Sequence, residues 1–222
     1  MFFSVGEQRK MSPKDFYDDS WLRLCQRLNE MPFASQLMSL SRNFGSFAAI
    51  RAGLIVVKAP FIAVMAADLQ EPPELIHGLI AQLQSGQIDI ALGQRIGRED
   101  AWSTRILSNL FWDCFRKFIQ PEIPKGGVDI FACTRSVSNH LTSLPENISS
   151  LIGLLFWIGY RRGFVPYERK VRQIGVSSWS LRKKVKYLND SIFSFSDLPI
   201  QLLLRIGFAG LAISIILSII NI

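Results

Sequence analysis

An apolar run that gives way abruptly to polar residues, at residues 61–74, constrains the fold more than any other stretch. The run Phe61–Ala67 contains no polar side chain and is typical of a β-strand buried on both faces within a parallel sheet. Asp68 and Gln70 follow two residues apart, so their side chains leave the strand end on the same side. Pro72-Pro73-Glu74 favours the start of a helix. The pattern predicts a strand–loop–helix unit with polar residues at the carboxyl edge of a sheet.

That edge is where open α/β sheets bind their ligands. A carboxylate and an amide oxygen placed there can hold a hard divalent cation and, through the cation, phosphate groups. Asp68 and Gln70 are therefore candidate cation ligands. The same residues are also compatible with an aspartate that only caps the following helix.

The rest of the chain alternates between helix-like and strand-like patterns. We expect strands at 35–40, 88–92, 128–133 and 164–169, with helices at 18–30, 46–54, 72–83, 102–118, 137–144 and 148–157. This alternation is typical of a doubly wound α/β domain. A chain of 222 residues can bury one core of that kind.

The cysteines and histidines exclude two classes of protein. Cys25, Cys114 and Cys133 are odd in number and widely spaced, which indicates reduced thiols rather than a disulfide framework. His77 and His140 are too isolated to suggest a zinc site.

Positive charge is concentrated between Arg161 and Lys186. This segment contains nine basic residues and one acidic residue, a net charge of +8, whereas the whole chain carries +7, so the remainder sums to −1. Membrane lipid and nucleic acid are the usual partners of such a segment. The sequence that follows favours lipid and argues against nucleic acid.

A long apolar stretch ends the sequence. Residues 206–222 carry no charge, and Arg205 is the only charged residue from Leu198 onward. This stretch is long enough for a membrane-spanning helix, although a buried helix of a soluble protein is the alternative. The basic residues before it are expected to stay on the cytoplasmic side, near anionic lipid. The apolar run at the N-terminus is too short for a signal peptide.

Five ordered motifs resemble a known family. They are SRNFG at 41–45, ADLQEPPE at 67–74, RIGRED at 95–100, a glycine-preceded Asp129, and RQIGVSSW at 172–179. In this order they resemble polyprenyl-phosphate glycosyltransferases, the dolichyl-phosphate mannose synthase-like and bactoprenol glucosyltransferase-like members of the inverting glycosyltransferase family 2. The likeness runs from about Asp18 to the end of the chain.

The resemblance implies a fold and a reaction. The fold is α/β, a GT-A (Rossmann-like) nucleotide-sugar domain. The reaction moves one sugar from a nucleotide-sugar donor of the UDP-glucose or GDP-mannose type to polyprenyl (undecaprenyl) phosphate, with inversion, in cell-envelope glycan synthesis. The implied cofactor is Mg²⁺ or Mn²⁺. The implied location is the cytoplasmic membrane, with the catalytic domain facing the cytoplasm.

The resemblance also implies roles for individual residues. Asp68 and Gln70 match the metal ligands, and Asp129 matches an aspartate on the acceptor side that orients the acceptor or assists as a base. Asp68 and Asp129 are thus the expected catalytic residues. A turn or helix-cap aspartate is the alternative for Asp129.

Basic residues are expected to hold the phosphates. By resemblance, Arg95 and Arg98 lie on a loop after a strand, near the donor phosphates, while Arg172 and Ser177 lie near the lipid phosphate. Forked guanidinium donors suit phosphate oxygens. A solvated surface charge is the alternative for each arginine taken singly.

The chain also departs from the family pattern. Residues 1–17 are expected to form no strand, so the first strands of the fold, which help hold the nucleotide, are missing; Asp18–Trp21 resembles only the tail of the second. Ala66 replaces the first acid of the usual Asp-x-Asp motif, and Ser178 replaces a lysine. A second membrane helix, found in many relatives, is also missing.

These features divide the chain into four expected segments. They are an atypical N-terminal segment (1–17), the glycosyltransferase domain (18–170), a basic juxtamembrane segment (171–197) that includes an amphipathic interfacial helix at about 181–195, and a transmembrane helix (198–222). For the interfacial helix, packing on the catalytic domain is the alternative.

Two other functions stay open at this point. The chain can be a catalytically silent membrane remnant or partner subunit of such an enzyme, or a basic membrane-surface module unrelated to sugars. The sequence leaves open the donor sugar, the final glycan and whether subunits associate into a homo-oligomer.

Overall fold

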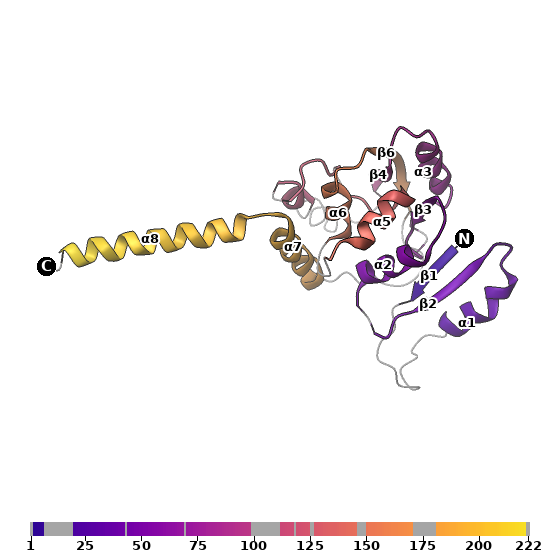
Figure 1. Cartoon of the computed structure of the whole chain (residues 1–222), viewed down its shortest axis with the longest axis horizontal. Helices are drawn as coiled ribbons and strands as arrows, with labels where there is room; N and C mark the ends of the chain where they lie inside the picture. Colours follow the sequence, from indigo (N-terminus) through magenta and orange to yellow (C-terminus); the bar gives the residue numbers. More distant parts are fainter. Residues whose placement is uncertain are drawn as a thin grey trace.

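The computed structural model describes residues 2–6, 20–42, 44–68, 70–98, 112–117, 119–124, 127–145, 150–170 and 181–220. Along the chain, the elements are β1 (Phe2–Gly6), α1 (Ser20–Arg27), the 3₁₀ turn η1 (Leu28–Glu30), β2 (Ser35–Ser39), α2 (Ser46–Val56), β3 (Phe61–Val64), α3 (Leu75–Gln84), β4 (Ile90–Arg98), β5 (Phe131–Thr134), α5 (Arg135–Ser143), α6 (Leu151–Trp157), β6 (Arg162–Arg169), α7 (Leu181–Phe195) and α8 (Leu198–Ile220) (Figure 1).

A four-stranded sheet in the order β3-β5-β4-β6 forms the centre of the domain. β5 runs antiparallel to both of its neighbours, and β4 runs parallel to β6. The carboxyl ends of β3, β4 and β6 therefore meet the amino end of β5 at one edge of the sheet. The prediction that the strand at Phe61 lies inside a parallel sheet is wrong, because β3 is an outer strand of this sheet and pairs antiparallel with β5.

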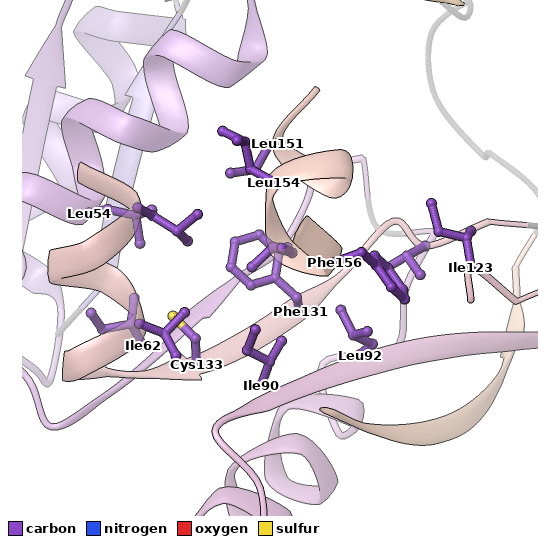
Figure 2. Close-up of a cluster of buried hydrophobic side chains, with 14 of the residues drawn as sticks. Leu54, Ile62, Ile90, Leu92, Ile123, Phe131, Cys133, Leu151, Leu154 and Phe156 are labelled. Atoms are coloured by element: carbon purple, nitrogen blue, oxygen red, sulfur yellow. The ribbon is translucent and has the colours of Figure 1, made fainter. Parts of the chain in front are cut away.

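Alternating side chains of this sheet build two apolar layers. Ile90 and Leu92 point to the face covered by α2, α5 and α6, whereas Ala91 between them packs under α3. This alternation follows from the two-residue period of a strand. Phe131, beside Leu92 in the sheet, is one of the buried aromatic side chains of the first layer, and Figure 2 shows it between the sheet and α6.

A second, two-stranded sheet is formed by β1 and β2, which pair in parallel with Phe2 opposite Ser35. The prediction that residues 1–17 contain no strand is therefore wrong. Phe2, Phe3 and Val5 are residues that favour strands, and β2 supplies the hydrogen-bonded ladder that orders them. The hydrogen bonds with β2 identify this strand, whereas its five residues are too few to show a clear alternation of apolar and polar side chains.

The helix α7 packs one face against the domain that contains the four-stranded sheet. Ser191 is fully buried there, the Tyr187 hydroxyl hydrogen-bonds Ser150 Oγ, and the Tyr187 ring stacks on Phe115 with ring centroids 6.2 Å apart. Arg182 and Lys186 on α7 are exposed. The sequence left two possibilities for this helix, contact with the membrane or packing on the domain. One face of α7 packs on the domain, and contact of its basic face with the membrane stays a prediction.

The helix α8 projects away from the rest of the molecule (Figure 1). It contains 23 residues, its most apolar 18-residue window has a mean hydropathy of 2.3, and none of that window is buried. By length and composition it can cross a membrane. The alternative of a helix buried inside a soluble domain does not describe α8.

Candidate active site at the carboxyl edge of the sheet

Four segments far apart in the sequence bring charged residues to the same edge of the four-stranded sheet. Asp68 follows β3, Arg95 lies in the second half of β4, Asp129 precedes β5, and Arg169 ends β6. Because β5 runs antiparallel, its amino end lies at this edge beside the carboxyl ends of the other strands. The strand directions alone therefore gather two acids and two guanidinium groups.

Asp129 lies at the centre of this group. Its Oδ2 forms an ion pair with Arg95, accepts a hydrogen bond from the Tyr167 hydroxyl at 3.2 Å, and is 4.0 Å from Arg169 Nε. The alternative of a helix-cap aspartate is excluded, because residue 129 leads into a strand. An ion pair with Arg95 and a hydrogen bond from Tyr167 hold the carboxylate, and the Arg169 guanidinium adds a more distant positive charge.

A glycine turn delivers Asp129 to this position. Gly127 has φ +79°, a conformation that costs an L-residue about 1–2 kcal/mol. A Cβ at residue 127 would also overlap the Trp112 ring. A glycine at position 127, two residues before Asp129, is thus required by the backbone conformation and by the nearby Trp112 ring.

Arg95 and Tyr167 are neighbours in the β4–β6 ladder. The Arg95 side chain is only 4% exposed. Burial raises the pKa of the Tyr167 hydroxyl above its ordinary value of 10.0, and the nearby Arg95 guanidinium opposes part of this rise. Tyr167 is therefore a neutral hydroxyl donor at physiological pH.

The location predicted for Arg95 and Arg98 is wrong. Both lie within β4, which extends to Arg98, rather than on a loop after a strand ending at residue 92. The strand continues because β6 pairs with it through Arg98 opposite Arg169, with an irregularity between Arg95 and Gly97. The side chain of Arg98 lies outside the described residues.

Arg169 connects three other groups of the site. Its Nη2 donates to Gln70 Oε1 at 2.7 Å, and its Nε is 3.5 Å from Glu71 Oε1 and 4.0 Å from Asp129 Oδ2. The Arg169 side chain is 22% exposed. One guanidinium thus joins the turn after β3 to the aspartate that precedes β5.

Glu71 is the most deeply buried acid of the site, with 1% of its surface exposed. Burial raises the pKa of its carboxyl above the ordinary value of 4.5, and the Arg169 guanidinium opposes part of that rise. Within the described residues neither carboxylate oxygen of Glu71 has a hydrogen-bond partner. Arg169 therefore supplies the principal stabilisation of this buried carboxylate.

Asp68 lies at the partly exposed rim of the site, and its Oδ1 accepts a hydrogen bond from the Gln70 backbone N–H at 3.3 Å. The alternative that Asp68 caps the following helix is excluded. The N-cap of α3 is Glu74, without a side-chain cap bond, and the first amides of α3 donate to the carbonyls of Pro72, Pro73 and Glu74. Asp68 thus has no part in starting this helix.

The amide of Gln70 is buried and engaged on both sides. Its Oε1 accepts from Arg169, and its Nε2 donates to the carbonyl oxygen of Lys170 at 3.3 Å. A carbonyl oxygen has two lone pairs, so contact with Arg169 leaves one site on Oε1. The predicted role of Gln70 as a metal ligand stays a prediction, and the contacts with residues 169 and 170 are an additional finding.

The donor atoms of this edge can be compared with what a hard cation needs. Among the residues that the structure describes, no three His, Cys, Asp or Glu side chains gather as a metal centre. Mg²⁺ commonly takes only one or two carboxylates from protein and completes its shell with water and substrate phosphates. Asp68 at the rim fits this pattern, with Gln70 beside it, whereas position 66 offers only an exposed alanine.

Three residues of the site were not predicted from the sequence: Glu71, Tyr167 and Arg169. Glu71 lies within the motif that carries Asp68 and Gln70, and Arg169 belongs to the basic segment, so there was a weak indication of each in the sequence. Nothing in the sequence pattern distinguishes Tyr167. Arg172 and Ser177, the predicted contacts of the lipid phosphate, lie outside the described residues.

The fold is of the α/β, GT-A-like class. The crystal structure of glucosyl-3-phosphoglycerate synthase from Mycobacterium tuberculosis in complex with phosphoglyceric acid superimposes with a TM-score of 0.52 at 13% sequence identity. The match covers 78% of this chain and 61% of that one. At this identity, the likeness concerns the fold alone.

Sequence comparison identifies the family. The profile described as Glycosyl transferase family 2 matches residues 15–142, more than half of the chain. The chain belongs to glycosyltransferase family 2, as the motifs predicted. An uncharacterized glycosyltransferase of Synechocystis sp. is 34% identical over 78% of this chain and 54% of its own length. The bactoprenol glucosyl transferase of Shigella phage SfV is 31% identical over 80% of this chain and 58% of its own length. The chain thus spans little more than half the length of these relatives.

Proposed function

We propose that this chain transfers a sugar from a nucleotide-sugar donor, of the UDP-glucose or GDP-mannose type, to polyprenyl phosphate at a membrane. The observation that carries the proposal is the convergence of Asp68, Arg95, Asp129 and Arg169 at one edge of the sheet. The name of the Shigella phage relative, a bactoprenol glucosyl transferase, supports the lipid acceptor. The exposed apolar helix α8 supports the membrane location.

In this reaction an oxygen of the acceptor phosphate attacks the anomeric carbon while the bond from that carbon to the donor diphosphate breaks. The acceptor is already an anion, so it needs positioning more than deprotonation. Asp129 is held by Arg95, Tyr167 and Arg169, which suits a group that orients substrates rather than one that moves freely to take a proton. Charge developing on the departing diphosphate is stabilised by guanidinium groups at the edge.

Asp68 is the proposed protein ligand of Mg²⁺ or Mn²⁺, with Gln70 as a second oxygen donor. When bound there, the cation would neutralise negative charge on the diphosphate. Within this chain, Asp68 presents a carboxylate at the rim, and Arg95 and Arg169 lie deeper. Arg98, Arg172 and Ser177 are proposed to contact phosphates, by resemblance.

The membrane arrangement is also part of the proposal. Basic residues 161–186 precede α8, and such charges favour the cytoplasmic side of a membrane. We place the domain on the cytoplasmic face, with α8 in the bilayer and the basic face of α7 toward anionic headgroups.

The test uses the full chain in lipid nanodiscs with Mn²⁺, undecaprenyl phosphate and radiolabelled UDP-glucose or GDP-mannose. We expect label to enter the organic-extractable lipid, and Asp68→Asn to lower the rate by about a thousandfold, as loss of a charge partner at a phosphate site does. Asp89→Asn is the matched control, because Asp89 pairs with Arg161 away from the site. Absence of labelled lipid with either donor would contradict the proposal.

A second candidate is a catalytically silent, membrane-associated remnant or partner subunit. Two observations favour it: Ala66 lies where the family has an acid, and β1 and β2 form a sheet separate from the one that carries the site. This candidate predicts that UDP or GDP with Mn²⁺ leaves the unfolding temperature unchanged. A ligand at a hundredfold excess over its Kd would stabilise the fold by about 2.7 kcal/mol, so a clear shift rejects the silent candidate.

A further inference from the structure

Gln70 is bonded to residues almost a hundred positions away in the sequence. Its backbone carbonyl accepts from the Lys170 N–H at 2.9 Å, its side-chain Nε2 donates to the Lys170 carbonyl, and its Oε1 accepts from Arg169. The main chain and the side chain of Gln70 are thus both hydrogen-bonded to the end of β6. The turn that carries Asp68 is fixed to the point where the chain leaves the sheet toward residues 171–180.

The chemistry of these contacts requires an amide at position 70. An amide presents a donor and an acceptor at the same time, and both are used here. A carboxylate would still accept from Arg169, but its second oxygen would face the Lys170 carbonyl oxygen without a proton between them. The contact therefore discriminates glutamine from glutamate, although the two side chains have the same size.

Arg169 extends the connection into the site. It lies between Gln70, Glu71 and Asp129, with the buried Glu71 as its charge partner. A guanidinium has donors in a fixed planar fork, so it can orient several acceptors together. Lysine would keep the charge but lose this geometry.

On the basis of the proposed function, we propose that Gln70 and Arg169 form a clamp that holds the donor side of the site, at Asp68, in register with Asp129 on the proposed acceptor side. Both are positioning residues in this role. The clamp fixes the end of β6 and Asp129 relative to the turn at Asp68. Such registration matters because small misplacement of reacting groups costs a large part of the rate.

The decisive variant is Gln70→Glu, with Gln82→Glu as the matched control. Gln82 also connects α3 to β6, through its Nε2 and the carbonyl of Phe164 at 3.3 Å, but it lies away from the charged edge. The first readout is hydrogen exchange of the backbone amide of Lys170. We expect Gln70→Glu to speed this exchange about tenfold, as for the loss of one hydrogen bond, and Gln82→Glu to leave it unchanged.

The second readout separates positioning from metal binding. For Gln70→Glu and for Arg169→Lys, we expect kcat to fall about 100-fold while the donor KM and the Mn²⁺ concentration for half-maximal rate stay within about threefold. A glutamate is at least as good a metal ligand as glutamine, so a role in metal binding alone predicts retained kcat for Gln70→Glu. Unchanged slow exchange at Ile90 and Leu92 verifies that each variant is folded.

The outcomes separate the clamp from the proposed function. Unchanged exchange at Lys170 in Gln70→Glu overturns the clamp. A change in KM without a loss of kcat in Gln70→Glu and Arg169→Lys overturns it as well. If the wild-type chain transfers no sugar, the proposed function fails, and the exchange at Lys170 still decides whether the clamp exists.

Discussion

The two sheets of this molecule differ in how they are supported. In the four-stranded sheet, Ile90, Leu92 and Phe131 are at most 1% exposed and are covered by helices. In the unit of α1, η1 and β2, every described side chain from residue 22 to residue 42 is at least partly exposed, including Leu22 at 59% and Phe33 at 47%. Stability therefore resides in the larger sheet.

The difference also bears on the candidate site. Asp68, Arg95, Asp129 and Arg169 all belong to the four-stranded sheet and its loops. We infer that the proposed phosphate chemistry rests on the sheet whose core is the better buried.

The largest expected effect tests the support of the larger sheet. Phe131→Ala removes a buried ring and should lower the free energy of unfolding by about 3–5 kcal/mol. Leu37→Ala in β2, where the side chain is only partly buried, should cost less than about 1.5 kcal/mol. Urea unfolding of the two variants in the same detergent measures both. Equal losses would show that the two sheets are equally supported.

A medium effect tests how the backbone delivers Asp129. Gly127→Ala should cost about 2–4 kcal/mol, because it adds left-handed strain to overlap with Trp112. Gly86→Ala is the control: it has φ +71° but no heavy atom within 4 Å of the added Cβ, so strain alone predicts about 1–2 kcal/mol. Thermal unfolding compares the two. A larger loss for Gly86→Ala would contradict the assigned role of Trp112.

The smallest expected effect concerns α7 and is visible in its pH dependence. Burial raises the pKa of Tyr187 to about 12, above that of the unfolded chain. Its contribution to stability is complete below pH 10 and is lost as the pH rises toward 12, because only the unfolded state ionises there. Tyr187→Phe should cost about 1 kcal/mol at pH 7 through the lost hydrogen bond with Ser150.

Tyr187→Phe should also lose less of its free energy of unfolding than the wild type does when the pH is raised above 10, because phenylalanine does not ionise. The measurement is urea unfolding of wild type and Tyr187→Phe at pH 7, 9, 10 and 11, and the difference between the two proteins should shrink above pH 10. A constant difference across this range would mean that the surroundings of Tyr187, at Ser150 and Phe115, do not raise the pKa of its hydroxyl in the folded state.

Much of the fold could be predicted because its signals are local. The pattern around residues 61–74 correctly placed a strand, a polar turn and a helix, and the apolar sequence from Leu198, with Arg205 as its only charge, correctly placed α8. The alternation of helices and strands likewise predicted the α/β class. In these regions the secondary structure is determined by the spacing of apolar residues, the position of proline and the local composition. All three can be read within a window of fewer than about 20 residues.

The remainder depends on pairing between distant segments. The strand β1 is stabilised by its hydrogen bonds with β2. The paired residues, such as Phe2 and Ser35, are more than thirty positions apart in the sequence. The extension of β4 to Arg98 depends on β6. Arg169 entered the site because strand directions bring it to residue 70. Local periodicity contains no information on such partners, so Arg169 and Tyr167 could not be selected in advance.

The joint between α7 and α8 is only two residues long, Ser196 and Asp197. Because α7 is fastened to the domain by Tyr187 and Ser191, little slack separates the globular part from the start of α8. Two extended residues span about 7 Å. If α8 is embedded in a bilayer, the domain can neither rise far above the lipid surface nor search a wide area, so the proposed lipid-linked acceptor would have to diffuse laterally to it.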